Sequence, residues 1–254
     1  MKIYQPFQFK QFEIHQQQSA MKVGTDGVLL GAWAAVEGAK RILDIGTGTG
    51  LIALMMAQRN EKALIDAVEI DKKAYEEAKY NFEISKWSNR LSIFHDSIQD
   101  FAKNTAEKYD FIISNPPYFI NSTKSDKAAK NQVRHTDSLS FDELLNAVNQ
   151  LLTKDGKFCV VLPFSEGEQF YNLATEPSLS NRDTSGQAKA NKLYCIKKVI
   201  VRGREFKPVE RLLIEFSKEK KTYEENNLII QNSPKRHDYT EDYINLTKDF
   251  YLFM

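Results

Sequence analysis

Asparagine, two prolines and tyrosine stand together at residues 115–118, one residue after the apolar run Phe111–Ile113. The run is typical of a short buried strand, and two consecutive prolines can continue neither a strand nor a helix. The side-chain oxygen of Asn115 and the carbonyl of Pro116 could each accept one hydrogen from a planar amine, such as the exocyclic nitrogen of adenine. The amine lone pair would then point toward an electrophile. Alternatively, the prolines only end the strand.

The next residues fit the same chemistry. Pro117 has no N–H and disfavours a helical conformation at Pro116, so the two acceptors stay outside secondary structure. Tyr118, or Phe119 beside it, could stack on a flipped base. We therefore predict that Asn115, Pro116, Pro117 and Tyr118 are catalytic and that Tyr118 and Phe119 bind the substrate.

A glycine-rich loop follows the first predicted strand. Asp44 precedes Gly46, Gly48 and Gly50, with Thr47 between the first two glycines. Such a strand-to-helix turn lets the backbone approach a ligand beside the free N–H groups of a helix. The third glycine comes one residue earlier than in the dinucleotide fingerprint Gly-x-Gly-x-x-Gly. The spacing resembles the S-adenosylmethionine (SAM) loop of class I methyltransferases, and a tight turn without a ligand is the alternative.

Two later strand ends carry further candidate ligands. Glu69 ends the second predicted strand, where its carboxylate could accept hydrogen bonds from both ribose hydroxyls of a nucleoside. Asp71 is more simply the N-cap of the helix that follows. Asp96 and Ser97 follow the third predicted strand, where class I methyltransferases contact the adenine ring, although a plain turn is nearly as good an interpretation.

The NPPY motif is similar to that of the amino-methylating class I methyltransferases, which act on adenine N6, guanine N2 or a glutamine amide. Three further stretches, residues 9–34, 134–145 and 239–252, resemble the bacterial valine-tRNA adenine N6-methyltransferases, which modify the adenine just 3′ of the anticodon. The resemblance covers nearly the whole chain. It implies methyl transfer from SAM to N6 of adenine 37 in tRNA(Val), with the anticodon stem-loop as partner.

By the same resemblance, the stretch KVGTDG at residues 22–27 lines the SAM pocket. Thr25 and Asp26 are its best candidate ligands, and Asp26 could instead cap a helix. The complete set of predicted cofactor ligands is Thr25, Asp26, Asp44, Gly46, Thr47, Gly48, Gly50, Glu69, Asp96, Ser97 and Asn115.

Two other functions stay open. The first is a protein-glutamine N5-methyltransferase with a shortened front, because only 43 residues precede Asp44 and the release-factor enzymes carry a helical domain there. The second is a non-catalytic SAM-binding RNA module, which would have no need of Asn115.

Two basic clusters could contact RNA phosphates. The first directly continues from NPPY and consists of Lys124, Lys127, Lys130 and Arg134. The second lies on the last two predicted strands and consists of Lys197, Lys198, Arg202, Arg204, Lys207 and Arg211. Either cluster alone could be an ordinary solvated face.

The overall composition bears on the partners and the cellular compartment of the protein. Lysine plus arginine, 35, nearly balances aspartate plus glutamate, 34, so no global field attracts nucleic acid. Four scattered histidines and two cysteines in apolar runs predict no metal site and free thiols in a reducing compartment. The longest apolar run, Val28–Val36, is too short to span a membrane, and no signal peptide opens the chain. We expect a cytoplasmic protein without a membrane partner.

The elements that must position these residues alternate between short apolar runs and helical patterns, which predicts a parallel sheet. The expected strands are Arg41–Ile45, Leu64–Glu69, Leu91–Phe94, Tyr109–Ser114 and Gly156–Leu162, followed by a hairpin-like pair in residues 193–203 and 211–217. The expected helices are Leu51–Gln58, Lys72–Ile84, Phe141–Leu152 and one that Thr240 caps.

The expected fold class is α/β, a Rossmann-like class I SAM methyltransferase fold. Its mostly parallel seven-stranded sheet would carry an antiparallel edge strand and helices on both faces. One domain would span residues 1–254, with an N-terminal segment (1–40) lining the site, a catalytic core (41–218) and a C-terminal helical extension (219–254). The polar segment 175–192 is predicted to be a surface loop, longer and more polar than the family resemblance implies.

Overall fold

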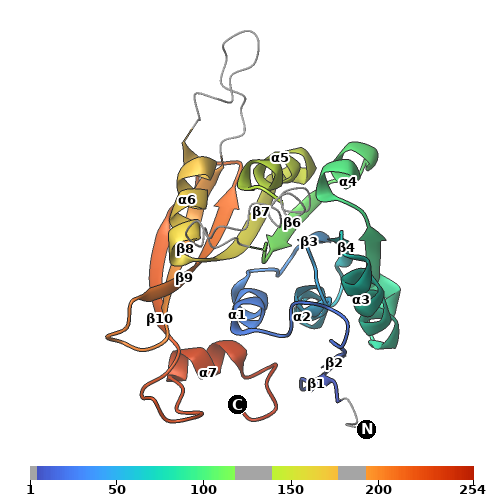
Figure 1. Ribbon diagram of the computed structural model, residues 1–254. Coiled ribbons are helices and arrows are strands. Elements are labelled where there is room, and N and C mark those ends of the chain that lie inside the picture. Colours follow the sequence, from blue (N-terminus) through green and yellow to red (C-terminus); the bar gives the residue numbers. More distant parts are fainter. Residues whose placement is uncertain (1–4, 118–138, 177–192) are drawn as a thin grey trace, which may run out of the picture.

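A computed structural model describes residues 5–117, 139–176 and 193–254. These residues form an eight-stranded sheet in the order β10-β8-β9-β7-β6-β3-β4-β5 and a separate two-stranded sheet (Figure 1). The strands are β1 (Phe7–Gln8), β2 (Glu13–Ile14), β3 (Arg41–Ile45), β4 (Leu64–Glu69), β5 (Leu91–His95), β6 (Tyr109–Ser114), β7 (Leu152–Pro163), β8 (Tyr194–Arg202), β9 (Val209–Ser217) and β10 (Glu224–Ile229). The helices are α1 (Thr25–Trp33), α2 (Leu51–Arg59), α3 (Lys72–Ile84), α4 (Ile98–Asn104), α5 (Phe141–Leu151), α6 (Phe164–Thr175) and α7 (Glu241–Thr247), with a short 3-10 turn at Ser88–Arg90.

Helices cover both faces of the large sheet. Helices α1, α2 and α7 contribute to one buried apolar cluster, whereas α4, α5 and α6 contribute to another on the opposite face. Strand β6 contributes to both clusters, because Phe111 and Ile113 belong to the first and Ile112 belongs to the second. Strands buried on both faces are typical of parallel sheets with helical crossovers, which explains the continuous apolar runs in the sequence.

The sheet differs from the expectation in two ways. It has eight strands rather than seven, because β10 joins it by pairing parallel to β8. The antiparallel strand β9 lies inside the sheet, between β7 and β8, and β10 takes the edge. The segment after residue 218 is therefore not only helical. Most of β10 is exposed and polar, so it has no apolar alternation that would have predicted a strand.

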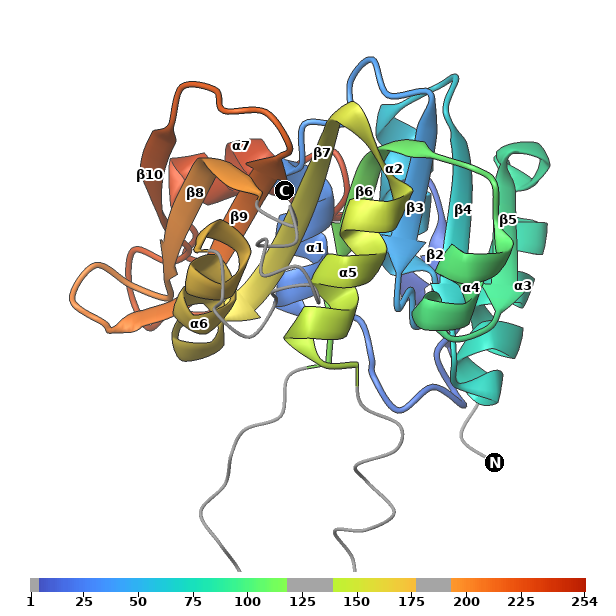
Figure 2. The same ribbon diagram turned by 90° about the horizontal axis from the view of Figure 1, so that it is seen from above.

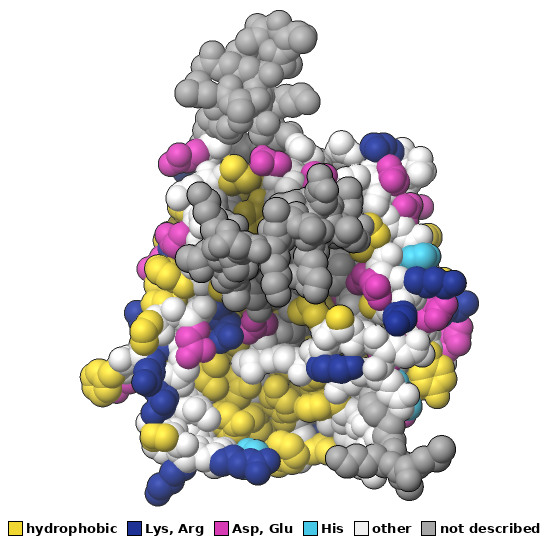
Figure 3. Space-filling view, viewed as in Figure 1, with side chains coloured by type: hydrophobic (Ala, Val, Ile, Leu, Met, Phe, Trp, Pro, Cys, Tyr) yellow, Lys and Arg dark blue, Asp and Glu magenta, His cyan; other side chains and the backbone are white. Residues whose placement is uncertain are grey.

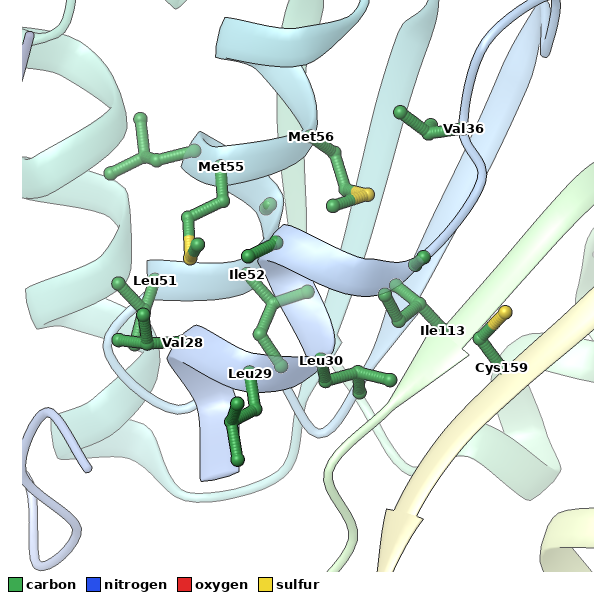
Figure 4. Close-up of a cluster of buried hydrophobic side chains, with 14 of the residues drawn as sticks. Val28, Leu29, Leu30, Val36, Leu51, Ile52, Met55, Met56, Ile113 and Cys159 are labelled. Carbon is green, nitrogen blue, oxygen red and sulfur yellow. The ribbon is translucent and has the colours of Figure 1, made fainter. Parts of the chain in front are cut away.

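Helix α1 packs closely on α2 on one face of the large sheet. Val28, Leu29 and Leu30 of α1 lie against Ile52 and its neighbours on α2 in one buried cluster (Figure 4). The close approach depends on Gly31 of α1, because a Cβ there would lie 2.5 Å from the sulfur of Met55. This packing fixes the start of α1, and with it Thr25 and Asp26, relative to the glycine loop that precedes α2.

The described part of the chain contains no helix of sufficient length and apolar character to cross a membrane. Within the same residues, no three His, Cys, Asp or Glu side chains gather into a group that could hold a metal ion. Cys159 is a buried free thiol and Cys195 a half-buried one.

Candidate functional site

A cavity of about 900 Å³ opens at the carboxyl ends of β3, β4 and β6, the edge that faces the viewer in Figure 1. A second cavity of about 250 Å³ adjoins it and shares Met21, Gly46, Gly48 and Asn115 with the first. Figure 2 shows the parallel strands side by side, with their carboxyl ends at this common edge. Open α/β sheets bind ligands at such an edge. Most of the predicted cofactor ligands line one cavity or both.

The glycine loop bends around the cavity with three left-handed glycines. Gly46, Gly48 and Gly50 have φ values of 68°, 59° and 83°, which side chains with a Cβ rarely adopt. A Cβ on Gly46 or Gly48 would meet nothing within 4 Å, whereas one on Gly50 would lie 2.5 Å from the ring of Phe82. The first two glycines therefore leave open space for a ligand, and the third permits close packing on α3.

Asp44 lies behind this loop and lines neither cavity. Its carboxylate accepts hydrogen bonds from the Thr47 hydroxyl at 2.6 Å and from the Ala53 amide at 3.2 Å. Burial raises the pKa of Asp44 to about 7, and these two donors oppose the rise. We infer that Asp44 supports the loop through Thr47 and does not contact the ligand.

Glu69 faces the larger cavity at the end of β4. One carboxylate oxygen accepts from the Gly48 amide at 2.8 Å and the other from the Asp71 amide at 2.9 Å. Each carboxylate oxygen has more than one acceptor site, so Glu69 can still accept from hydroxyls of a bound nucleoside. Asp71 accepts from the Ala74 amide and caps α3, as the sequence favoured.

Asp96 and Ser97 line the same cavity beyond β5. Ser97 caps α4 by accepting from the Asp100 amide, and Asp96 accepts from the amide of Ser97 at 2.7 Å. Both residues therefore form a turn and also border the cavity, so the two interpretations drawn from the sequence are compatible.

Asn115 lies directly beside the glycine loop. Ser114 pairs with Ile45 in the sheet, and its hydroxyl donates to the Ile45 carbonyl at 2.8 Å, so the next residues, Asn115 and Gly46, are neighbours. The side-chain oxygen of Asn115 is buried and has no hydrogen-bond partner among the described residues, although Asn115 lines both cavities. Buried polar atoms without a partner are costly, and their presence at a cavity points to a ligand. Pro116 is buried, and Pro117 is exposed on the wall of the larger cavity.

The stretch KVGTDG borders the smaller cavity. Thr25 and Asp26 begin α1, whose N-cap is Gly24, so Asp26 is not the cap. The Asp26 carboxylate instead forms an ion pair with Arg211 of β9, which also lines this cavity. The ion pair joins the first helix to the antiparallel strand inside the large sheet.

Comparisons with known proteins identify the family of this chain. The family model described as "Methyltransferase small domain" matches residues 21–173. A tRNA1(Val) (adenine(37)-N6)-methyltransferase of Flavobacterium psychrophilum is 43% identical over 98% of this chain and 100% of its own length. A relative with the same name from Trichodesmium erythraeum is 45% identical over 97% of each chain. The chain belongs to the tRNA1(Val) (adenine(37)-N6)-methyltransferase family.

Solved structures support the fold of this family member. A predicted O-methyltransferase of Agrobacterium tumefaciens matches 89% of this chain and 96% of its own, with a TM-score of 0.66 and 16% identity. TYW2 of Pyrococcus horikoshii in complex with MeSAdo matches 81% of this chain and 67% of its own, with a TM-score of 0.51 and 12% identity. At such identities the likeness concerns the Rossmann-like methyltransferase fold alone.

In this family member the N-terminal segment also lines the larger cavity, through Ser19, Ala20 and Met21. Buried Glu77 of α3 accepts from the amides of Gln18 and Ser19 at 3.0 and 2.8 Å. Buried Asn81 accepts from the His15 amide and donates to the carbonyls of His15 and Thr49, each at 2.9 Å. Sequence reasoning missed Glu77 and Asn81, whose only signal was a polar residue on the inner face of a predicted helix.

The far wall of the larger cavity was not predicted either. It is formed by Ile98, Gln99, Asp100, Lys103, Leu139, Ser140 and Glu143. These residues come from α4 and from the start of α5, where Ser140 and Glu143 form a capping box. Their sequence pattern indicates helix starts and carries no sign of a cavity.

Of the two predicted basic clusters, the structure describes only the second. Lys124, Lys127, Lys130 and Arg134 lie outside the described residues, as do Tyr118 and Phe119. The second cluster divides into engaged and unengaged members. Lys198 pairs with Glu168 and Glu225, and Arg211 pairs with Asp26. Lys197 lies over the Trp33 ring. Arg202 donates a hydrogen bond to Asn227. For Arg204 and Lys207 the described structure contains no ion pair.

Proposed function

We propose that this protein transfers a methyl group from SAM to N6 of adenine 37 in tRNA(Val), with the anticodon stem-loop as the bound part of the substrate. The observation that carries the proposal is the buried side-chain oxygen of Asn115. It lacks a hydrogen-bond partner among the described residues and lies where both cavities meet the glycine loop. An acceptor at that position suits an amine that carries hydrogens.

The cavity residues fit a SAM molecule. Open space in front of Gly46 and Gly48 allows the backbone to lie against the ligand, and Glu69 can accept from ribose hydroxyls. Asp96 and Ser97 would border the adenine ring at the far side of the larger cavity. Thr25 and Asp26 would hold the amino-acid end in the smaller cavity. When bound, SAM supplies an electrophilic methyl group.

The protein then activates the nucleophile by position and hydrogen bonding. The lone pair of an exocyclic amine is delocalised into its ring, so the amine is a poor nucleophile until it becomes tetrahedral. The Asn115 oxygen and the Pro116 carbonyl each accept one amine hydrogen and keep the lone pair directed at the methyl group. Tyr118 stacks on the flipped base. The proton leaves after transfer, so no general base with a shifted pKa is required.

The deciding experiment offers labelled SAM with unmodified total tRNA, followed by nucleoside analysis, and in a parallel reaction with a release factor, followed by amino-acid analysis. We expect labelled N6-methyladenosine in tRNA(Val) and no label in release factors. A methylglutamine or methylguanine product would replace this function by another amino-methylating activity. SAM binding to the wild type without any transfer would favour a non-catalytic module.

A further inference from the structure

The turn between β8 and β9 presents a large apolar side chain to solvent. Phe206 is 94% exposed, and Arg204 and Lys207 lie on either side of it in the chain. Of the two nearby acids, Glu205 directly precedes Phe206, and Glu210 pairs with Arg211. An aromatic ring that is almost wholly exposed gains nothing from the core, and between two cations it is a suitable surface for a nucleobase.

A second loop lies directly beside this turn. The Ile230 amide donates to the Arg202 carbonyl and the Gln231 amide to the Gly203 carbonyl, each at 3.0 Å. Residues 231–239, which continue from there, contain Lys235 and Arg236. We call Arg204, Phe206, Lys207, Lys235 and Arg236 together the basic ridge. Figure 3 shows Lys and Arg side chains gathered along the lower left margin of the cavity face, where these loops lie.

The second loop is held in a defined shape. Asn232 donates from its side chain to the Asp238 carboxylate at 3.1 Å, and its amide donates to the Asp238 carbonyl at 3.0 Å. His237 has a φ of 63°, the one non-glycine left-handed residue in the described chain. Strained conformations persist where the surroundings over-determine them, and they gather at functional surfaces. Lys235 and Arg236 are therefore presented from a fixed loop.

The basic ridge lies at the same edge of the sheet as the cavities. Arg211 pairs with Pro163 at the carboxyl end of β7 and lines the smaller cavity. Lys207 and Arg211 are only four positions apart, a span of roughly 13 Å in an extended chain. An RNA whose target base enters the cavity would therefore pass the ridge.

We propose that the basic ridge docks the tRNA substrate, with its cations on backbone phosphates and Phe206 stacked on an unpaired base of the loop. The inference rests on the proposed function, because it names where that substrate is held. RNA is favoured over a protein partner because three cations of the ridge are available for phosphates. Within the described residues, no ion pair is formed by Arg204, Lys207 or Arg236. Single-stranded RNA loops offer unstacked bases beside closely spaced phosphates.

The test compares two triple variants. The first is Arg204→Ala/Phe206→Ala/Lys207→Ala, and the control is Lys220→Ala/Lys221→Ala/Tyr223→Ala in the β9–β10 turn. Both remove two cations and one aromatic ring, and Figure 2 shows the two turns at opposite edges of the sheet. Affinity for unmodified tRNA(Val) transcript is measured at several salt concentrations, together with KM, kcat and SAM affinity.

We expect the ridge variant to lose roughly 10-fold to 100-fold in tRNA affinity and to raise KM for tRNA, with kcat and SAM affinity close to wild type. The slope of log affinity against log salt should become shallower by about 1.5 for two lost phosphate contacts. Phe206→Trp should retain affinity that Phe206→Ala loses, because tryptophan also stacks. The control variant should match wild type.

Three results would overturn the inference. If the ridge variant matches the control in affinity and salt slope while the wild type methylates tRNA, the ridge does not dock RNA and the proposed function stands. If light scattering shows that Phe206→Ala changes only the oligomeric state, the ridge is a contact between copies. If the wild type methylates no tRNA, the proposed function is wrong, and this inference, which depends on it, is wrong as well.

Discussion

At the scale of single residues, Asn115 and Glu69 share a cavity but have different partners. Glu69 already accepts two backbone hydrogen bonds, whereas the oxygen of Asn115 accepts none from the described residues. We therefore propose that Glu69 supports and binds the cofactor and that Asn115 binds the reacting amine. Their replacement should change different measurements.

Asn115→Ala should lower turnover roughly 100-fold to 1000-fold, equivalent to about 2.7 to 4 kcal/mol, by analogy with the loss of one preorganised oxyanion donor. SAM affinity and most tRNA affinity should remain, because the interaction is made mainly in the transition state. Tyr118→Ala should differ by weakening tRNA binding as well as turnover, because stacking holds the base before reaction. Near-normal turnover of Asn115→Ala, with chemistry rate-limiting, would reduce NPPY to a strand terminator.

Glu69→Ala should weaken SAM binding by about 1 to 3 kcal/mol, because the ribose hydroxyls lose their acceptor and the Gly48 amide loses its support. Calorimetric titration with SAM measures the change. Glu76→Ala is the matched control, since Glu76 lies on α3 with an exposed side chain. Equal affinities for the two variants would remove Glu69 from the site.

Asp44 gives a prediction about pH. Its pKa is raised to about 7 in the folded protein from an ordinary value of 3.8, so the folded state binds this proton more tightly than the unfolded chain. The resulting stability is complete below pH 3.8 and is lost as pH rises to about 7. Across this window the wild type should lose up to about 4 kcal/mol of unfolding free energy relative to Asp44→Asn. Denaturant titrations at several pH values test this, and a constant difference would contradict it.

At the scale of elements, the close contact between the glycine loop and α3 leaves no room for a side chain at position 50. Gly50 and Gly38 have nearly the same φ, 83° and 84°, but only at Gly50 would a Cβ meet another side chain, the ring of Phe82. Gly38→Ala should therefore cost about 1 kcal/mol for backbone strain alone. Gly50→Ala should cost a further 1 to 3 kcal/mol, roughly, for overpacking. Equal unfolding free energies of the two variants would show that Phe82 moves aside freely.

Elements with strong local signals were predictable from the sequence. Strands β3, β4 and β6 and helix α3 have the bounds expected, because apolar runs and caps mark their ends. Helix α1 was not predicted as an element, since it is buried almost all round and contains two glycines, so it shows no amphipathic period. The ion pair between Asp26 and Arg211 could not be foreseen either, because it depends on where β9 inserts in the sheet.

At the scale of the whole molecule, the formal net charge is only +1, so attraction for RNA must come from local patches. Affinity for tRNA should therefore fall with salt with a slope of about 0.9 or less for each phosphate contact, while SAM affinity changes little. Filter binding between 50 and 200 mM salt, with calorimetry for SAM, gives both dependences. Affinity for tRNA that is independent of salt would exclude phosphate contacts as its main source.

The ion pair between Asp26 and Arg211 also has a consequence for the order of synthesis. The residues are 185 positions apart, so the wall they share is complete only after β9 has left the ribosome. The glycine loop, Glu69 and Asn115 are all made earlier. A nascent chain can thus form most of the parallel sheet before the smaller cavity has its last side, and we propose that it becomes able to hold SAM only near the end of translation.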